Sequence, residues 1–322
     1  MGKMKSVGFF SPEGKSNLLK KEELYKKEKE LIKEEFKQRG NILNWRDASI
    51  QDMLNSFARK VIETSIDVSK DIDIIPSLLP TEEIDPGDTF VWHELYGAQV
   101  WYGTYGAAAR LSRPMLREYT ATTNLKEVGL KLDLTQIQTG KYSPSELGEF
   151  TAALINAWRQ RLLFTTTING NSVFSSGGAQ YVTGAGVGTA TILTSLETLS
   201  EESDAKVIVA RRKGVNYLSN QSSFSNETRR EFEQQGQAGS IFGVPILKVN
   251  TFVDPLYGTV YPFPDNDIYI FSQLPAGRFV RASQVQTDNE TIPSNQTMNM
   301  YFRWDDGIGI FKTDRIVRIH AT

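Results

Sequence analysis

The chain has 322 residues, of which 39% are hydrophobic and 23% are charged, and its formal net charge at pH 7 is −2. This length can bury a sizeable core, in one large domain or two modest ones. The near-balanced charge argues against a dedicated nucleic-acid reader, which would carry a strongly basic face. The sequence has no cysteine, which excludes disulfides, thiolate zinc sites and cysteine nucleophiles.

The sequence predicts neither a signal peptide nor a membrane-spanning helix. The first ten residues contain only a short apolar stretch and lack the hydrophobic region of a signal peptide. No apolar run approaches the roughly 20 residues that a membrane helix needs. We therefore expect no membrane partner and a cytoplasm-like compartment.

The first predicted element is a helix over residues 16–39, rich in lysine and glutamate. Its apolar face is too narrow to anchor a core of its own. The segment is therefore either a solvated helical tail or an arm that packs on a neighbouring subunit, and we favour the arm. The candidate contact residues of the arm are Leu24, Tyr25, Leu31, Ile32 and Phe36.

The next stretch predicts a second helix over 47–66, a short strand at 72–76 and a turn at 85–88. Residues 89–95 alternate like a strand, and 118–131 are extended again. Between them lies a flexible run rich in glycine, alanine and aromatic residues, so we expect a long two-stranded excursion. Because aromatic residues dominate interface energetics, this excursion is a candidate inter-subunit contact. Its candidate residues are Trp92, Tyr96, Trp101, Tyr102, Tyr105, Arg110 and Arg113.

Ser143 to Glu146 form the clearest local signal in the chain. Ser143 suits a helix N-cap, Pro144 suits the first helical position, and Glu146 completes a capping box. Apolar residues then recur every three or four positions, which predicts a helix to about residue 166. At 1.5 Å per residue it spans roughly 30–35 Å, a length that suits a structural spine.

The rest of the chain mixes short helices and strands. A glycine-rich loop at 177–188 precedes a helix at 190–202, and a buried strand at 206–210 precedes a helix at 211–218. Helices and strands do not alternate regularly, which favours an α+β fold over a doubly wound one. The remaining expected strands are 242–249, 267–271, 277–285, 297–304 and 308–319, with a probable turn within the last at 314–315.

Motifs for catalysis or metal binding are weak. Gly184 to Gly188 lacks the spacing of a phosphate loop, and no lysine follows it. His93-Glu94 would need a second histidine where Gly97 stands, so zinc binding is not predicted. His320, the other histidine, has no obvious partner in the sequence. We expect no catalytic residue, no cofactor and no metal, although an enzyme with a glycine-rich pocket near Gly184 stays open as an alternative.

Charged clusters have equally ordinary interpretations. The carboxylate pairs 82–83, 201–202 and 305–306 are typical of solvated turns or caps, because adjacent residues do not face one another. The basic triplet 211–213 would contact DNA or an acidic neighbour, or form a solvated helix end.

Three passages, in this order along the chain, resemble a known family. Ile168-Asn169-Gly170 follows the long helix, residues 206–212 lead to Gly243-Val244-Pro245, and residues 303–310 form a terminal strand pair. Taken in order they resemble the Hong-Kong-97-type major capsid proteins of tailed bacteriophages, whose fold is shared with encapsulins. The resemblance implies an N-terminal arm at 1–45, a helix and strand at 46–87, an extended loop (E-loop) at 88–123, a peripheral domain with the spine helix at 124–171, an axial domain at 172–276 and C-terminal peripheral strands at 277–322.

The resemblance also implies a function. The chain would self-assemble into hexamers and pentamers of an icosahedral or prolate head that encloses double-stranded DNA, and it would not be an enzyme. Its partners would be itself, a portal protein, scaffold or decoration proteins, and packaged DNA bound non-specifically. It would be located in the virion and assembled in the host cytoplasm. The alternatives are an encapsulin-like nanocompartment shell protein and another virion structural protein, such as a tail or decoration protein.

Some members of the family cross-link their chains through a lysine of the E-loop. This sequence has no lysine between Lys70 and Lys126, so that nucleophile is missing. We predict a non-covalent assembly: after boiling in denaturant, the chain should run on a gel as a 36.2 kDa monomer. A ladder of covalent multimers would contradict this.

Overall fold

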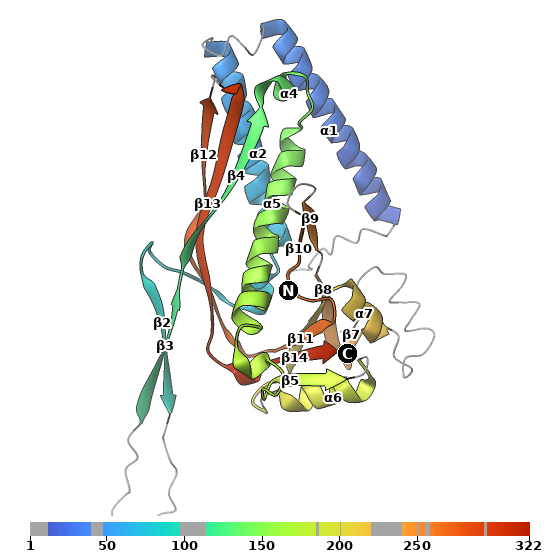
Figure 1. Cartoon of the computed structure of the whole chain (residues 1–322), viewed down its shortest axis with the longest axis vertical. Helices are drawn as coiled ribbons and strands as arrows, with labels where there is room; N and C mark the ends of the chain where they lie inside the picture. Colours follow the sequence, from blue (N-terminus) through green and yellow to red (C-terminus); the bar gives the residue numbers. More distant parts are fainter. Residues whose placement is uncertain are drawn as a thin grey trace, which may run out of the picture.

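The computed structural model describes residues 12–39, 48–96, 114–184, 187–199, 201–219, 240–249, 251–254, 258–292 and 295–322. These residues form an elongated part, a compact part and a projecting two-stranded ribbon (Figure 1). A four-stranded sheet of order β1-β12-β13-β4 runs through the elongated part, and a six-stranded sheet of order β5-β14-β11-β6-β8-β7 forms the compact part. The fold is therefore α+β, as expected from the sequence.

The bounds of the elements follow the chain. The helices are α1 (Pro12–Arg39), α2 (Ala48–Ile72), α3 (Ile75–Leu78), α4 (Leu134–Gln138), α5 (Pro144–Arg161), α6 (Thr189–Thr198) and α7 (Arg212–Ser219). The strands are β1 (Thr81–Glu83), β2 (Thr89–Tyr96), β3 (Met115–Thr122), β4 (Asn124–Asp133), β5 (Tyr181–Gly184), β6 (Ala205–Ala210), β7 (Ser240–Ile241), β8 (Val244–Lys248), β9 (Phe252–Asp254), β10 (Gly258–Val260), β11 (Asp267–Ser272), β12 (Gly277–Ile292), β13 (Thr297–Ile310) and β14 (Ile316–Ala321).

The core of the elongated part lies between its sheet and α2. The strands β12 and β13 pair antiparallel, and β4 pairs antiparallel with β13. Because side chains alternate along a strand, every second residue of β13 enters the core. From the helix side, α2 contributes its apolar stripe. The buried residues are Met298, Met300, Phe302 and Trp304 from β13, and Ile50, Met53, Leu54, Phe57, Ala58 and Val61 from α2.

The compact part has a core on each face of its sheet. All six residues of the central strand β11 are buried. Tyr269 and Phe271 face one core, whereas Ile268 and Ile270 face the other, which also receives residues of α6 and α7. Strands covered on both faces are apolar without alternation, as the stretches 207–210 of β6 and 268–271 of β11 are.

The helix α5 runs as predicted from a capped start. Ser143 is the N-cap, and its hydroxyl accepts a hydrogen bond from the backbone N–H of Glu146. Beyond Arg161 the chain continues as a π-helical segment, Leu162–Ile168. Leu163, Phe164 and Ile168 of this segment are buried in the core on one face of the six-stranded sheet. The helix therefore begins on the elongated part and ends in the compact part.

Two local predictions are wrong. The expected strand at 72–76 does not form, because α2 extends to Ile72 and α3 begins at Ile75, with Pro76 in its first turn, where its fixed φ is suitable. The expected grouping of 277–322 also fails at its end. The strand β14 pairs with β11 and β5 in the six-stranded sheet, since its alternating apolar residues fill both cores of that sheet.

Gly148 provides a stability test of the α2–α5 contact. A Cβ at this position would lie 2.6 Å from Cβ of Thr64 and 2.8 Å from the carbonyl oxygen of Val61. We expect Gly148→Ala to destabilise the subunit by about 1–3 kcal/mol through overpacking, measured by urea denaturation. The matched control is Gly129→Ala, whose added Cβ would make only an ordinary 3.7 Å contact with Tyr301. Equal midpoints for the two variants would contradict the prediction.

Candidate assembly surfaces

The β2–β3 ribbon is fixed to its own chain along one face, which we call the inner face. The rings of Trp92 and Tyr119 lie 5.7 Å apart, and each packs on Phe311, at 5.2 and 5.5 Å. Glu94 on the same face pairs with Lys312, and this hydrogen bond lowers the pKa of Glu94. Trp92, which we expected to pack across a subunit boundary, instead anchors the ribbon to its own chain, because Phe311 offers it an aromatic surface.

The opposite face of the ribbon, the outer face, is exposed. Leu95 and Leu116 are cross-strand neighbours, with 72% and 53% of their surfaces exposed. Next to them His93 pairs with Glu118 across the strands, with Nδ1 and Oε1 3.5 Å apart. Val91 completes the face and is also exposed. An exposed apolar row around one histidine–glutamate pair is typical of a surface that binds a partner.

The end of the ribbon carries the remaining candidates of the excursion. Tyr96 is 47% exposed and pairs with Met115, and its contact with another subunit stays a prediction. Five further candidates lie outside the described residues: Trp101, Tyr102, Tyr105, Arg110 and Arg113.

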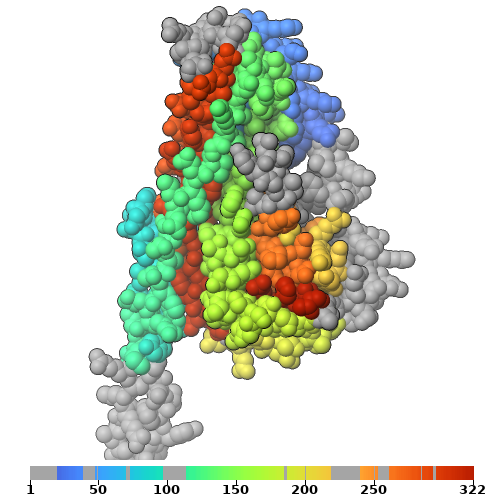
Figure 2. Space-filling view, in the orientation of Figure 1, coloured from blue at the N-terminus to red at the C-terminus, as the bar shows by residue number. Residues whose placement is uncertain are grey.

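The helix α1 lies against its own chain, beside α4 and α5 (Figures 1 and 2). Phe36 is only 2% exposed and belongs to the core of the elongated part, and Ile32 packs against that core. The expectation of a contact with a neighbouring subunit is therefore wrong for Phe36, whereas Ile32 is only partly buried and its contact stays a prediction. The intrachain core has room for them because α2 and α4 converge there. Leu24 and Leu31 stay accessible, at 48% and 58% exposure.

A buried carboxylate joins α1 to the start of α5. Glu28 accepts hydrogen bonds from the hydroxyls of Ser143 and Ser145, and it pairs with Lys60 at 2.8 Å. The positive end of the α5 dipole also favours an anion here. Burial opposes the ionisation of Glu28, but the hydrogen bonds from Lys60 and the two serines outweigh it and lower the pKa of Glu28.

Further ion pairs and a close backbone contact hold the same interface. Lys21 pairs with Glu149 at 2.8 Å, and Lys29 pairs with Glu146 at 2.6 Å. Tyr25 hydrogen-bonds Glu149, and burial together with this carboxylate raises the pKa of Tyr25. At Gly140, with φ of +67°, a Cβ would lie 2.4 Å from the carbonyl oxygen of Lys29, so only glycine fits.

A second buried charge cluster holds α5 to the four-stranded sheet. Asp306 of β13 is fully buried and pairs with Arg159 of α5 at 2.8 Å and with Lys126 of β4 at 2.5 Å. Arg159 also reaches Asp73, with nitrogen and oxygen 3.4 Å apart, and burial raises the pKa of Asp73. The interpretation of 305–306 as a solvated turn is wrong for Asp306, because β13 continues through it to Ile310.

Two other sequence interpretations change. His320 has a partner, since its Nδ1 lies 2.7 Å from Oδ1 of the buried Asp267, which Arg318 also contacts at 2.9 Å. Arg211 of the basic triplet is buried and pairs with Asp265 at 2.9 Å, whereas the rest of the triplet, 212–213, is exposed. Sequence reasoning missed these pairs because their partners are distant along the chain.

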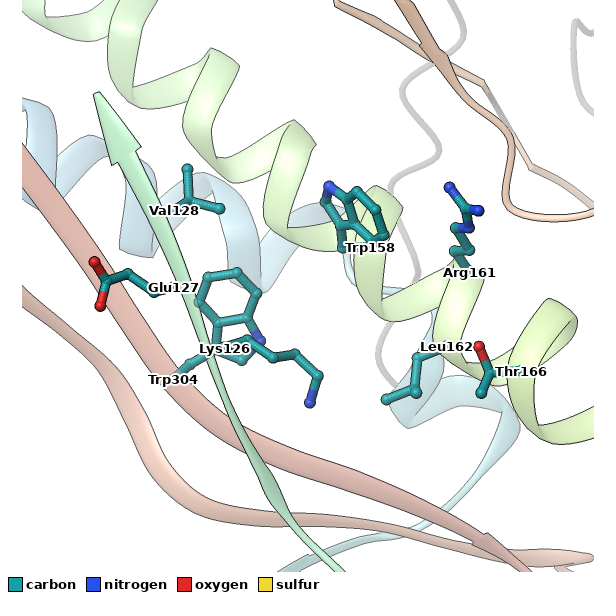
Figure 3. A pocket seen from close by; sticks show the side chains of 8 residues that line it. All are labelled: Lys126, Glu127, Val128, Trp158, Arg161, Leu162, Thr166 and Trp304. Carbon is teal, nitrogen blue, oxygen red and sulfur yellow. The ribbon is translucent and has the colours of Figure 1, made fainter. Parts of the chain in front are cut away.

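The described part of the chain shows no group of three or more histidine, aspartate or glutamate side chains placed to hold a metal ion. Among the same residues no helix is both long and apolar enough to cross a membrane. A hollow of about 420 Å³ lies between α5 and the strands β4 and β13 (Figure 3). Together with the outer face of the ribbon and the exposed leucines of α1, it is a candidate contact surface.

Comparisons with solved structures identify the fold. The capsid of an empty GTA particle superposes with a TM-score of 0.55 at 10% identity, covering 77% of this chain and 89% of that one. The mature capsid of bacteriophage PhiM1 superposes with a TM-score of 0.52 at 10% identity, covering 75% of this chain and 85% of that one. A virus-like particle from Pyrococcus furiosus superposes with a TM-score of 0.52 at 12% identity, covering 82% of this chain and 99% of that one. No family model and no curated protein matches the sequence. The chain has the Hong-Kong-97-type capsid fold that its sequence resembles.

The Glu28 contact generates a pH-dependent prediction. We expect Glu28→Ala to cost about 1–3 kcal/mol of unfolding free energy at pH 7, because it leaves buried donors unpaired. The folded pKa of Glu28 is lowered, so its contribution is complete above the unfolded pKa of about 4.3 and is lost as the pH falls through the folded value. Urea denaturation at pH 7 and at pH 3 measures the difference.

The control for this experiment is Glu30→Ala, since Glu30 is an exposed glutamate on the same helix. Its effect should stay within about 0.5 kcal/mol at either pH. A Glu28→Ala penalty that equals the Glu30→Ala penalty, or that grows on acidification, would contradict the role given to Glu28.

Proposed function

We propose that the chain is the major capsid protein of a tailed bacteriophage, a shell subunit that assembles into hexamers and pentamers of an icosahedral or prolate head around double-stranded DNA. The observation that carries the proposal is a projecting ribbon with an exposed apolar outer face, on a subunit whose fold is that of capsid proteins. A two-stranded ribbon alone is marginally stable in water, so a partner surface would stabilise it.

The parts of the subunit take the roles that this fold implies. The β2–β3 ribbon is the E-loop, α5 is the spine helix, the elongated part is the peripheral domain and the six-stranded sheet is the core of the axial domain. In support, Arg159 of α5 pairs with the buried Asp306 of the elongated part, and the π-helical segment that continues α5 is buried in a core of the compact part. The inter-subunit role of α1 rests on Leu24 and Leu31, which remain exposed.

The partners follow from the same proposal. The chain contacts itself throughout the shell, a portal protein at one vertex, and scaffold or decoration proteins where the particle uses them. The near-zero net charge suits a wall that holds packaged DNA non-specifically without binding it tightly. Assembly takes place in the host cytoplasm, and the finished protein resides in the virion.

An encapsulin-like shell is the second candidate. The observation in its favour is the similarity to the Pyrococcus furiosus virus-like particle, which covers 99% of that chain. The contents of purified particles separate the two functions. Nuclease-protected DNA supports the phage head, whereas a protein cargo without DNA supports a compartment.

The outer face of the ribbon supplies the test of assembly. We expect the double variant Leu95→Ser, Leu116→Ser to give a folded subunit that forms shells at least tenfold less efficiently, because it loses apolar area on contact with a neighbour. Light scattering and negative-stain microscopy measure the yield of particles, and circular dichroism checks folding.

The matched control is Leu95→Met, Leu116→Met, which keeps an apolar side chain at both positions. It should assemble like the unmodified chain. Shells of normal size and yield from the serine variant would overturn the role of the outer face.

A further inference from the structure

The elongated and compact parts meet in one shared core at the end of α5. Phe164 and Ile168 of the π-helical segment lie in this core with Tyr269 of the six-stranded sheet, and Phe279 of β12 joins them from the elongated part. The ring of Phe164 lies 4.9 Å from that of Tyr269 and 4.6 Å from that of Phe263. Helices commonly bend at π-helical turns, so this junction has the features of a pivot.

A second contact between the parts lies well away from the junction. The hairpin of β9 and β10 leaves the compact part and runs beside α5 (Figure 1). The ring of Phe252 in β9 lies 5.3 Å from the ring of Phe150 in α5, at a distance and tilt that aromatic pairs favour. Phe150 precedes Phe164 by 14 positions, so this contact is about 20 Å along the helix from the junction.

The start of α5, where Phe150 lies, is held within the elongated part. Gly148 lies so close to Thr64 of α2 that a Cβ would be 2.6 Å from the Cβ of Thr64. Glu149 pairs with Lys21 of α1 at 2.8 Å. Phe150 is the next residue and is half-buried. A contact on Phe150 is therefore a contact on the elongated part.

The root of the hairpin is held within the compact part by Arg211. Its guanidinium donates hydrogen bonds to the hydroxyl of Thr251, before β9, at 2.6 Å and to the carbonyl oxygen of Phe263, after β10, at 2.7 Å. It also pairs with Asp265 at 2.9 Å, and only 6% of Arg211 is exposed. Hydrogen bonds from a charged donor are stronger than those between neutral groups, so both legs of the hairpin are fixed to the end of β6.

The far end of the hairpin depends on α5 for its position. Within the described part of the chain, β9 and β10 pair only with each other. A hairpin of two strands is marginally stable in water, and packing against a helix stabilises it. Loss of the contact between Phe252 and Phe150 would therefore release the hairpin from α5, while Arg211 would still hold its root.

We propose that the β9–β10 hairpin is a strap that fixes the angle between the elongated and the compact part. It connects the two parts at Phe150, at a distance from the pivot, where a single contact resists rotation most effectively. With Phe252 on Phe150 the subunit keeps one angle, and with Phe252 released the two parts turn about the π-helical segment. This inference concerns the single subunit and goes beyond its proposed role in a shell.

A distance between two spin labels reports this angle. Because the chain has no cysteine, Asp67→Cys on α2 and Glu197→Cys on α6, both at exposed positions, place one label on each part. The labelled full-length chain is mixed with an excess of unlabelled chain, so that double electron–electron resonance records distances within one molecule. We expect Phe252→Ala and Phe150→Ala each to widen the distance distribution about twofold, because the parts are then free to turn.

Three further variants separate the strap from a general loss of packing. Phe252→Ala combined with Phe150→Ala should widen the distribution no more than either change alone, since the two rings form one contact. Phe252→Leu keeps an apolar side chain against α5 and should retain most of the narrow distribution. The matched control is Phe242→Ala, which removes an exposed ring of the compact part outside the strap and should change nothing.

Unchanged widths in both single alanine variants would overturn the strap, and so would an equal widening by Phe242→Ala. Circular dichroism follows the folding of each variant. Global unfolding of the alanine variants would also contradict the proposal, because a strap sets an angle and is not part of either core. None of these outcomes depends on the formation of shells, so the proposed function is tested separately.

Discussion

A ribbon of two strands has two faces, and the described part of this chain covers only one of them. Phe311 receives the aromatic residues of the inner face, whereas the leucines of the outer face remain in water. Burial of apolar area contributes roughly 25 cal/mol per Å², so such a face gains stability only by meeting another surface. The ribbon projects away from the body of its own chain (Figure 1), and we propose that this surface belongs to a second molecule.

Contacts at the root of the ribbon, with the four-stranded sheet and with α5, fix its direction. The ribbon leaves the four-stranded sheet where Gly307 lies against the carbonyl oxygen of Thr122, a contact too close for any Cβ. One residue earlier, Asp306 binds Arg159 of α5 inside the protein. Breaking a buried ion pair on one side typically costs several kcal/mol, so sheet, helix and ribbon root are fixed together.

Local signals predicted local structure well. The cap at Ser143 and the three- and four-residue spacing of apolar residues predicted α5, because helix starts depend on neighbouring residues alone. The alternation at 89–95 and the extended run at 118–131 predicted a two-stranded excursion, but that run is divided between β3, which pairs with β2, and β4, which pairs with β13. The structure differs from the sequence-based expectation where a residue's environment depends on a partner that is distant in the sequence. Asp306 and His320 are paired with residues more than 50 positions away. Phe36 is buried for the same reason, since its face meets α2 and not solvent.

The candidate surfaces were predicted only in part for a related reason. Aromatic content pointed to residues 88–123, but the aromatic residues Phe90, Trp92 and Tyr119 lie on the inner face of the ribbon, and composition alone does not assign a residue to a face. Trp92 turned inward, while the exposed leucines carry the outer face. The hollow beside Trp158 escaped prediction altogether, because its lining comes from three elements that meet only in the folded chain.

The proposed assembly depends on the exposed apolar outer face of the ribbon, which a single molecule leaves in water. Electron microscopy of the purified full chain tests this most directly. Closed shells, with density of one subunit's ribbon lying on the next subunit, are the result that this account predicts. Dispersed single subunits or pairs at every concentration, with the ribbon folded back on its own chain, would contradict it.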